Sequence, residues 1–258
     1  MGRTIAIANQ KGGVGKSTTA INLSACLAES EKKVLIIDID PQGNTTSGFG
    51  VEKNEVENTV YQLLLGECEL KDCIIDLDIE NLDLIPSNVN LSGAEIELIG
   101  VENKEYILKS NIDQVRDEYD YIIIDCPPSL NMLTINAMTT ANTVLVPIQC
   151  EYYALEGLTQ LMHTIDLVQD RLNPELEMEG VVFTMFDART NLSLQVVENV
   201  KANLNQNIYK TIIPRNVRLA EAPSYGLPIT LYDGRSAGAE SYRLLAEEVI
   251  HRGDEEWL

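Results

Sequence analysis

The chain has 258 residues, of which 45% are hydrophobic, a composition that excludes a disordered protein and supports a sizeable core. Its 19 Lys and Arg residues face 40 Asp and Glu residues, which gives a formal net charge of −21. Such a surface repels polyanions, so a general affinity for nucleic acid or anionic lipid is excluded, and any such contact requires a local basic patch.

Short apolar runs alternate with helical patterns along the whole chain, as is typical of α/β proteins. Some runs, such as Val34–Ile37 and Tyr121–Ile124, are apolar at every position, so helices must cover both faces of these strands. In chain order, the predicted strands are Thr4–Ala8, Val34–Ile39, Leu82–Pro86, Tyr121–Asp125, Thr143–Ile148, Gly180–Met185 and Tyr209–Ile213. The predicted helices are Lys16–Glu29, Asn58–Leu65, Gly93–Ile99, Tyr106–Glu118, Ser129–Thr140, Leu155–Leu172, Leu192–Leu204 and Ser236–His251.

These elements predict a single three-layer α/β domain over residues 1–258, with a mostly parallel twisted sheet flanked by helices on both faces. Gly43–Leu82 is the least regular part, and its acidic residues and weak periodicity predict exposed helices and loops. No apolar run is long enough for a transmembrane helix, and the N-terminus carries no signal-peptide pattern.

The cysteines are odd in number and lack the spacing of zinc ligands. Only two of them lie close together in the sequence, and no histidine cluster accompanies them. We therefore expect free, mostly buried thiols in a reducing cytoplasm. They are Cys26, Cys68, Cys73, Cys126 and Cys150.

The most specific motif is Asn9–Thr19, which reads NQKGGVGKSTT between the first strand and the first helix. Its glycines let the backbone wrap closely around a phosphate chain, and successive N–H groups form an anion-binding nest at a helix N-terminus. Lys16 is expected to reach the β- and γ-phosphates of a nucleotide, and the Ser17 hydroxyl to ligate Mg²⁺. The predicted binding run comprises Lys11, Gly12, Gly13, Val14, Gly15, Lys16, Ser17 and Thr18.

Carboxylates end two of the buried strands. Asp125 closes an apolar strand just before two prolines, at the sheet edge where the phosphate loop lies, so we interpret it as the Mg²⁺-holding acid. The alternative is an Asp that only caps the next turn. Asp38 and Asp40 share one side of the second strand. Each of them is either a functional carboxylate or a structural one. A structural role is the alternative for Asp40 because it precedes Pro41, as aspartates that begin a turn do.

The chain resembles the deviant Walker A group of P-loop ATPases, and within it the ParA/Soj chromosome-partition branch. The usual motif has glycine where Gln10 stands, and the variant here carries the additional Lys11. The resemblance covers nearly the whole chain. The matching stretches are Asn9–Thr19, Asp38–Asn44, Asp120–Ser129, Gln149–Leu158 and Ile213–Ser224.

This resemblance implies an ATPase that uses ATP and Mg²⁺ as a slow molecular switch. It implies that Asp40 orients the attacking water, which makes Lys11, Lys16 and Asp40 the predicted catalytic residues. It also implies that Lys11 crosses a dimer interface to the other subunit's nucleotide, so that ATP yields a homodimer and ADP a monomer. Pro214 and Asn216 are implied to contact adenine.

The resemblance further implies non-specific binding of double-stranded DNA by the ATP-bound dimer, hence a cytoplasmic, nucleoid-associated protein, and stimulation by a ParB-type centromere-binding partner. The family's DNA-contacting arginines match Arg189 and Arg218, and Lys201 lies in the same basic stretch. Residues 181–220 hold five Lys and Arg against two Asp and Glu, or +3, which leaves −24 for the remainder of the −21 total. This asymmetry indicates a local phosphate-binding patch, although a solvated helix face with scattered cations is the alternative.

Other members of the superfamily offer competing interpretations. A MinD-like membrane-positioning ATPase needs a basic amphipathic C-terminal helix, whereas residues 246–256 are acidic, so we expect no membrane binding. An electron-transfer ATPase resembling the nitrogenase iron protein needs cysteines that bind an iron–sulfur cluster, and the cysteines of this chain do not fit that pattern. A bacterial tyrosine kinase needs a tyrosine-rich tail, which this sequence lacks.

Overall fold

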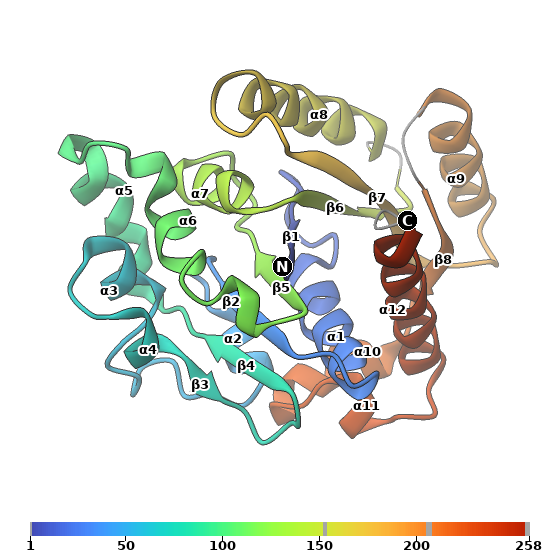
Figure 1. Ribbon diagram of the computed structural model, residues 1–258. Helices are drawn as coiled ribbons and strands as arrows, with labels where there is room; N and C mark the ends of the chain where they lie inside the picture. The colour runs from blue at the N-terminus through green and yellow to red at the C-terminus, as the bar shows by residue number, and fades with distance from the viewer. Residues whose placement is uncertain (1, 152–153, 205–207, 256–258) are drawn as a thin grey trace.

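The computed structural model describes residues 2–151, 154–204 and 208–255 and contains one eight-stranded sheet (Figure 1). The strand order is β3-β4-β2-β5-β1-β6-β7-β8, and every neighbouring pair is parallel except β3 with β4. The strands are β1 (Arg3–Ile7), β2 (Val34–Asp38), β3 (Ile75–Asp76), β4 (Leu82–Ile85), β5 (Tyr121–Asp125), β6 (Thr143–Gln149), β7 (Glu177–Phe186) and β8 (Ile208–Pro214).

Helices cover both faces of this sheet, which confirms the predicted fold class. They are α1 (Lys16–Glu29), α2 (Asn44–Gly48), α3 (Val60–Leu65), α4 (Leu70–Cys73), α5 (Ala94–Glu97), α6 (Ile107–Ile112), α7 (Met132–Thr140), α8 (Ala154–Arg171), α9 (Asn191–Asn203), α10 (Val217–Glu221), α11 (Ile229–Tyr232) and α12 (Ala237–Glu255). Short 3₁₀ turns occupy Val89–Gly93, Leu98–Gly100, Lys104–Tyr106, Arg116–Glu118 and Ala222–Tyr225.

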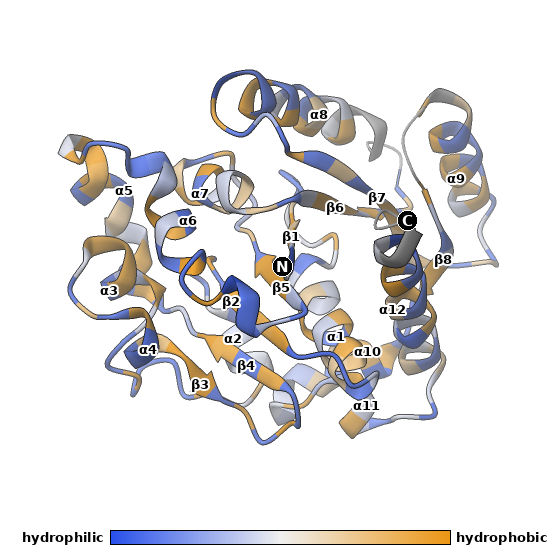
Figure 2. Cartoon of the chain, in the orientation of Figure 1, coloured by the Kyte–Doolittle hydropathy of each residue, from blue (hydrophilic) through white to orange (hydrophobic). Residues whose placement is uncertain are grey.

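The apolar runs of the strands supply two separate hydrophobic cores. Ile37 and Ile122 point to the core beneath α3 and α5 to α9, whereas Ile36 and Ile123 point to the core beneath α1, α11 and α12. Successive side chains of a strand face opposite sides, so an uninterrupted apolar strand needs a helical layer on each side. Figure 2 shows the resulting pattern, with apolar residues gathered in the strands and polar residues on the outer sides of the helices.

Strand β7 starts earlier than predicted because the sequence did not reveal that a charged residue there is buried. Strand β7 begins at Glu177 rather than Gly180, and its register with β6 shifts around Glu179. The Glu179 side chain is fully buried and accepts from Arg3 at 2.7 Å, Thr143 at 2.6 Å and Tyr209 at 2.5 Å. Partners from three other strands therefore make this carboxylate part of the sheet.

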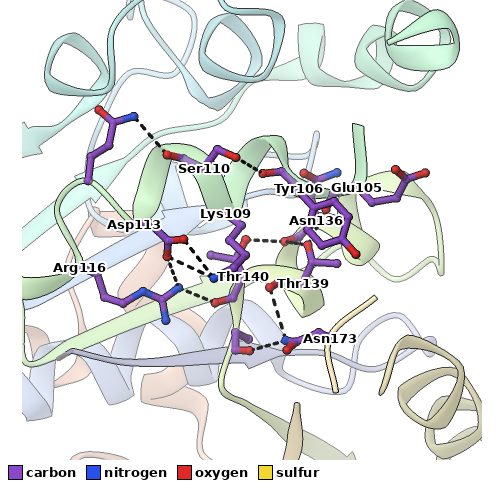
Figure 3. Close-up of polar contacts among 12 residues, drawn as sticks. Glu105, Tyr106, Lys109, Ser110, Asp113, Arg116, Asn136, Thr139, Thr140 and Asn173 are labelled. Atoms are coloured by element: carbon purple, nitrogen blue, oxygen red, sulfur yellow. Dashed lines mark hydrogen bonds and ion pairs between the residues drawn. The ribbon is translucent and has the colours of Figure 1, made fainter. Parts of the chain in front are cut away.

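Two helical predictions were wrong in extent or continuity. The expected helix Gly93–Ile99 is only one α-helical turn between two 3₁₀ turns, and Tyr106–Glu118 breaks after Ile112. Figure 3 shows why the second one ends: Arg116 turns inward, donates to the Thr140 carbonyl at 2.9 Å and pairs with Asp113 at 2.9 Å. A contact with the end of α7 thus replaces the last helical turn.

The irregular segment 43–82 contains the predicted helix α3 and three elements that the sequence did not predict, namely α2, α4 and the antiparallel edge strand β3. Its helices are less exposed than expected, since Leu63 and Leu64 of α3 enter the core. In the same segment Thr59 caps α3 in a capping box with Gln62. Among the described residues, no helix is long and apolar enough to cross a membrane.

Candidate nucleotide site

The phosphate loop connects β1 to α1 and emerges at the carboxyl edge of the sheet. Gly13 and Gly15 have φ angles of 74° and 90°, in the left-handed region that glycine adopts without strain. Val14 is buried, and its carbonyl accepts from Thr184 Oγ1 at 2.7 Å. The loop borders a cavity of about 440 Å³. Its lining residues are Gly12, Gly13, Gly15, Lys16, Ser17, Thr18, Ile21, Asp40, Gln42, Asn44, Ser47, Gly48, Pro128, Met185 and Pro223.

Lys16 is the cation of this cavity and is only 6% exposed. Its Nζ donates to the backbone carbonyl of Lys11 at 3.2 Å, which folds the loop around the ammonium group. Burial lowers the pKa of Lys16, and the nearby carboxylates of Asp125 and Asp40 act in the opposite direction. A cation with little access to water interacts strongly with an anion that enters the cavity, such as a phosphate chain.

Two carboxylates lie side by side at the ends of neighbouring strands. Asp38 of β2 and Asp125 of β5 are register partners, and both are completely buried. Burial and the charge of Asp38 raise the pKa of Asp125 to about 7, against the opposing effect of the Ser17 and Thr45 hydroxyls. Thr45 donates to Asp125 Oδ2 at 2.7 Å, whereas Oδ1 has no hydrogen-bond partner in the described structure. A buried, unpartnered carboxylate oxygen near a serine hydroxyl fits a hard cation such as Mg²⁺.

Asp38 and Asp40 have different environments although they share a strand end. Asp38 accepts from the backbone N–H of Thr46 at 2.8 Å, from its hydroxyl at 2.7 Å and from the backbone N–H of Asp40 at 3.1 Å. Asp40 lines the cavity, and its Oδ1 accepts from the Gln42 N–H at 2.9 Å. Asp38 therefore bonds to the loop that follows the strand, and Asp40 is the carboxylate that faces the cavity.

A second cavity of about 320 Å³ adjoins the first and shares Gly15, Thr18 and Met185 with it. Its walls include Pro214 and Asn216, the pair that the family resemblance implies as adenine contacts. The Asn216 side-chain oxygen accepts a hydrogen bond from the Arg218 backbone N–H at 2.8 Å and caps α10. The side-chain NH₂ group of Asn216 takes no part in this cap. The other lining residues are Thr184, Ile213, Arg215, Val217, Leu219, Ala220 and Tyr242.

Comparison with known proteins agrees with this geometry. The AAA domain family matches residues 2–178. The chain is 58% identical over 253 residues to "Sporulation initiation inhibitor protein Soj" of Bacillus subtilis, covering 98% of this chain and 100% of that protein. It is 51% identical over 252 residues to "Chromosome partitioning protein ParA" of Myxococcus xanthus, covering 98% and 89%.

The chain belongs to the Soj/ParA family of chromosome-partitioning ATPases. Among solved structures, cobyrinic acid a,c-diamide synthase from Mycobacterium smegmatis with bound ADP and magnesium is 35% identical, with a TM-score of 0.88, and the match covers 98% of this chain and 96% of that one. The P-loop ATPase fold of this Soj/ParA chain is therefore shared with a protein that holds ADP and magnesium.

The additional lysine of the Soj/ParA phosphate loop does not line the nucleotide cavity in this single chain. Lys11 Nζ instead donates to Glu151 Oε2 at 2.6 Å, and the two side chains are 37% and 47% exposed. Tyr152 and Tyr153, in the stretch that resembles partition proteins, lie outside the described residues. Lys11 is thus at the surface and paired within its own chain.

The cations predicted to contact DNA lie beyond the ends of β7 and β8, two strands paired through Phe186 and Pro214. Arg189 is 87% exposed, and its guanidinium forms two hydrogen bonds to Asp187, at 2.8 and 2.7 Å. These bonds lower the pKa of Asp187 and keep that carboxylate ionised. Arg218 is 54% exposed and pairs with Glu221 at 2.9 Å. Both arginines are therefore accessible but partly neutralised by their neighbours, while Lys201 is exposed in the last turn of α9.

The sequence reasoning missed the residues that position the two buried acids. Thr45 and Thr46 belong to α2 and reach Asp125 and Asp38, respectively. The two adjacent threonines after Gly43-Asn44 could have indicated these contacts, since short hydroxyl side chains often form hydrogen bonds to nearby groups at a helix N-terminus. Met185 also lines both cavities, with a φ of 51°, a conformation uncommon for residues other than glycine.

Proposed function

We propose that this Soj/ParA chain hydrolyses ATP with Mg²⁺ and acts as an ATP-gated switch in chromosome or plasmid partition, with residues 1–258 as one functional domain. The observation that carries the proposal is the 440 Å³ cavity, where Lys16, Ser17 and Asp40 converge beside the unpartnered Oδ1 of Asp125. These groups provide a phosphate cradle, oxygen ligands for a cation and a carboxylate for water.

Each residue then has a distinct task in the conversion of ATP and water to ADP and phosphate. The glycine-rich backbone and Lys16 bind the phosphates, while Ser17 and Asp125 would hold Mg²⁺, which would neutralise charge on the reacting phosphoryl group. Asp40 accepts a hydrogen bond from the attacking water and orients it. Pro214 provides an apolar surface for adenine, and the amide of Asn216 provides its polar contact. Because Lys16 is the cavity's main cation in one chain, intrinsic turnover is expected to be slow.

Dimerisation requires Lys11 to exchange partners. Two copies of a chain with a net charge of −21 repel each other, so a lysine that meets the partner's triphosphate supplies attraction at the interface. Its ion pair with Glu151 is exposed and therefore weak, so breaking that pair costs little free energy. ADP lacks the terminal phosphate, so hydrolysis is expected to release the dimer.

DNA binding follows from the dimer in the same proposal. Arg189, Arg218 and Lys201 offer few phosphate contacts in one chain, and two chains double them, so non-specific duplex binding becomes dependent on ATP. The ion pairs of Arg189 with Asp187 and of Arg218 with Glu221 must break before the arginines can contact DNA phosphates. We therefore expect DNA binding to weaken strongly as the salt concentration rises. The acidic surface suits a basic segment of a ParB-type stimulating partner, and the protein is expected to be cytoplasmic and nucleoid-associated. A membrane-positioning role is not favoured, because α12 carries Glu247 and Glu248.

A duplex-DNA mobility-shift assay with ATP, ADP or no nucleotide tests the proposal. Retention of random-sequence DNA should require ATP, should persist in Asp40→Ala, which traps the ATP state, and should be lost on joint reversal of Arg189 and Arg218 to Glu. Sedimentation of Asp40→Ala with ATP should show a dimer that the added substitution Lys11→Ala dissolves. Equal retention without nucleotide, or a monomeric Asp40→Ala protein saturated with ATP, would rule out the switch.

A further inference from the structure

Two cysteine thiols lie in contact on the outer flank of the sheet, outside the nucleotide site. The Sγ atoms of Cys68 and Cys73 are 2.9 Å apart, and both residues are free thiols. Cys73 ends α4 and is buried, with its Sγ 3.7 Å from the Thr59 carbonyl. Cys68 lies in the turn between α3 and α4 and is only partly buried.

We propose that Cys68 and Cys73 form a redox-active dithiol that closes to an intramolecular disulfide when hydrogen peroxide reaches Cys68. The Cys68 thiol releases its proton, and the thiolate attacks one peroxide oxygen and breaks the O–O bond. The hydroxide that leaves takes up a proton, so the products are a Cys68 sulfenic acid and one water. The Cys73 sulfur then attacks Cys68 Sγ and breaks its S–O bond, and the Cys73 proton leaves with the hydroxyl group as a second water. Two thiols are oxidised, and one peroxide is reduced to two waters.

Both the distance and the difference in access support this order of events. A disulfide bond measures about 2.05 Å, so the two sulfurs at 2.9 Å need only a small further approach. Cys68 is the more accessible thiol, and oxidation follows accessibility. Burial raises the pKa of Cys73, as does its contact with Cys68, so Cys73 is not the thiol that reacts first with peroxide. Cys26, Cys126 and Cys150 are buried and are expected to react much more slowly.

The test uses the full-length protein, reduced, freed of reductant and treated with one equivalent of hydrogen peroxide. Alkylation under denaturing conditions should then modify three of the five cysteines, and non-reducing peptide mapping should join the Cys68 and Cys73 peptides. The closed loop is short, so the melting temperature should rise by only about 3–8 °C and should return to its original value with dithiothreitol.

Single variants separate the pair from unspecific oxidation. Cys68→Ser should keep all four remaining thiols alkylatable after the same treatment. Cys150→Ser, the matched control, should still lose two thiols to the Cys68–Cys73 bridge. Alkylation of all five cysteines in the wild type, a bridge to any other cysteine, or a Cys68 sulfinic acid without a Cys73 bond would overturn the proposal. None of these results depends on nucleotide binding, so the outcome is independent of the proposed function.

Discussion

Replacing Asp125 with Asn should stabilise the nucleotide-free protein while it removes the response to Mg²⁺ and ATP. Asp125 is completely buried beside Asp38, and its Oδ1 has no hydrogen-bond partner in the described structure. The folded chain therefore carries a poorly compensated charge, which is why the pKa of Asp125 is about 7 rather than 3.8. That difference corresponds to about 4 kcal/mol at a pH above both values.

The sign follows from proton binding. A carboxyl with a raised pKa binds more protons in the folded state, so this group does not weaken the fold below the unfolded pKa of 3.8. The destabilisation grows as the pH rises towards about 7 and is constant above it. Asp125→Asn removes this effect, and because the new amide also needs buried partners, we expect a net gain of about 1–4 kcal/mol at alkaline pH. For a chain of this size that gain raises the melting temperature by about 3–12 °C.

Thermal or urea unfolding across acidic to alkaline pH, with and without Mg²⁺ and ATP, measures these effects. Wild-type stability should decline more steeply with pH than that of Asp125→Asn, which retains the smaller contribution of buried Asp38. Mg²⁺ and ATP should stabilise only the wild type. Asp76→Asn, which removes an exposed carboxylate from β3, is the matched control and should change little. An Asp125→Asn protein less stable than the wild type at alkaline pH, or equally pH-dependent, would refute the reasoning.

Other substitutions test separate parts of the structure. Glu179→Gln removes the buried charge that contacts Arg3 at 2.7 Å, so urea unfolding should show a loss of about 3–5 kcal/mol; a change below 1 kcal/mol would contradict a buried ion pair. Asn173→Ala deletes the amide that donates to the carbonyls of Met138 and Ala141 at 2.9 Å, and calorimetry should show a loss of about 1–3 kcal/mol. Glu151→Gln releases Lys11 from an exposed pair, so ATP-dependent dimerisation should tighten about two- to fivefold by sedimentation, and unchanged or weaker dimerisation would count against Lys11 acting across the interface.

Much of the site could be predicted because short, continuous stretches of the sequence identify its main residues. The phosphate loop sits between an apolar strand and a helix, and the observed helix Lys16–Glu29 has the predicted limits. Asp125 and Asp40 stand at strand ends, and parallel strands bring their carboxyl ends to one edge of the sheet. Chain order and periodicity therefore sufficed to place these residues near one another, although their chemical roles remain predictions.

Long-range contacts determined the rest. The predicted strand begins at Gly180 and leaves Glu179 out, yet an ion pair with Arg3, which is 176 residues away, makes Glu179 a buried member of the sheet. Periodicity predicted a continuous helix through Arg116, but that side chain leaves the helix for the end of α7. The difference between Asp38 and Asp40 also appears only when Thr46 folds back onto one of them. Burial and partner choice depend on which distant segments meet, so the sequence determined which chemical groups were present, and tertiary packing decided which of them became structural and which faced the cavity.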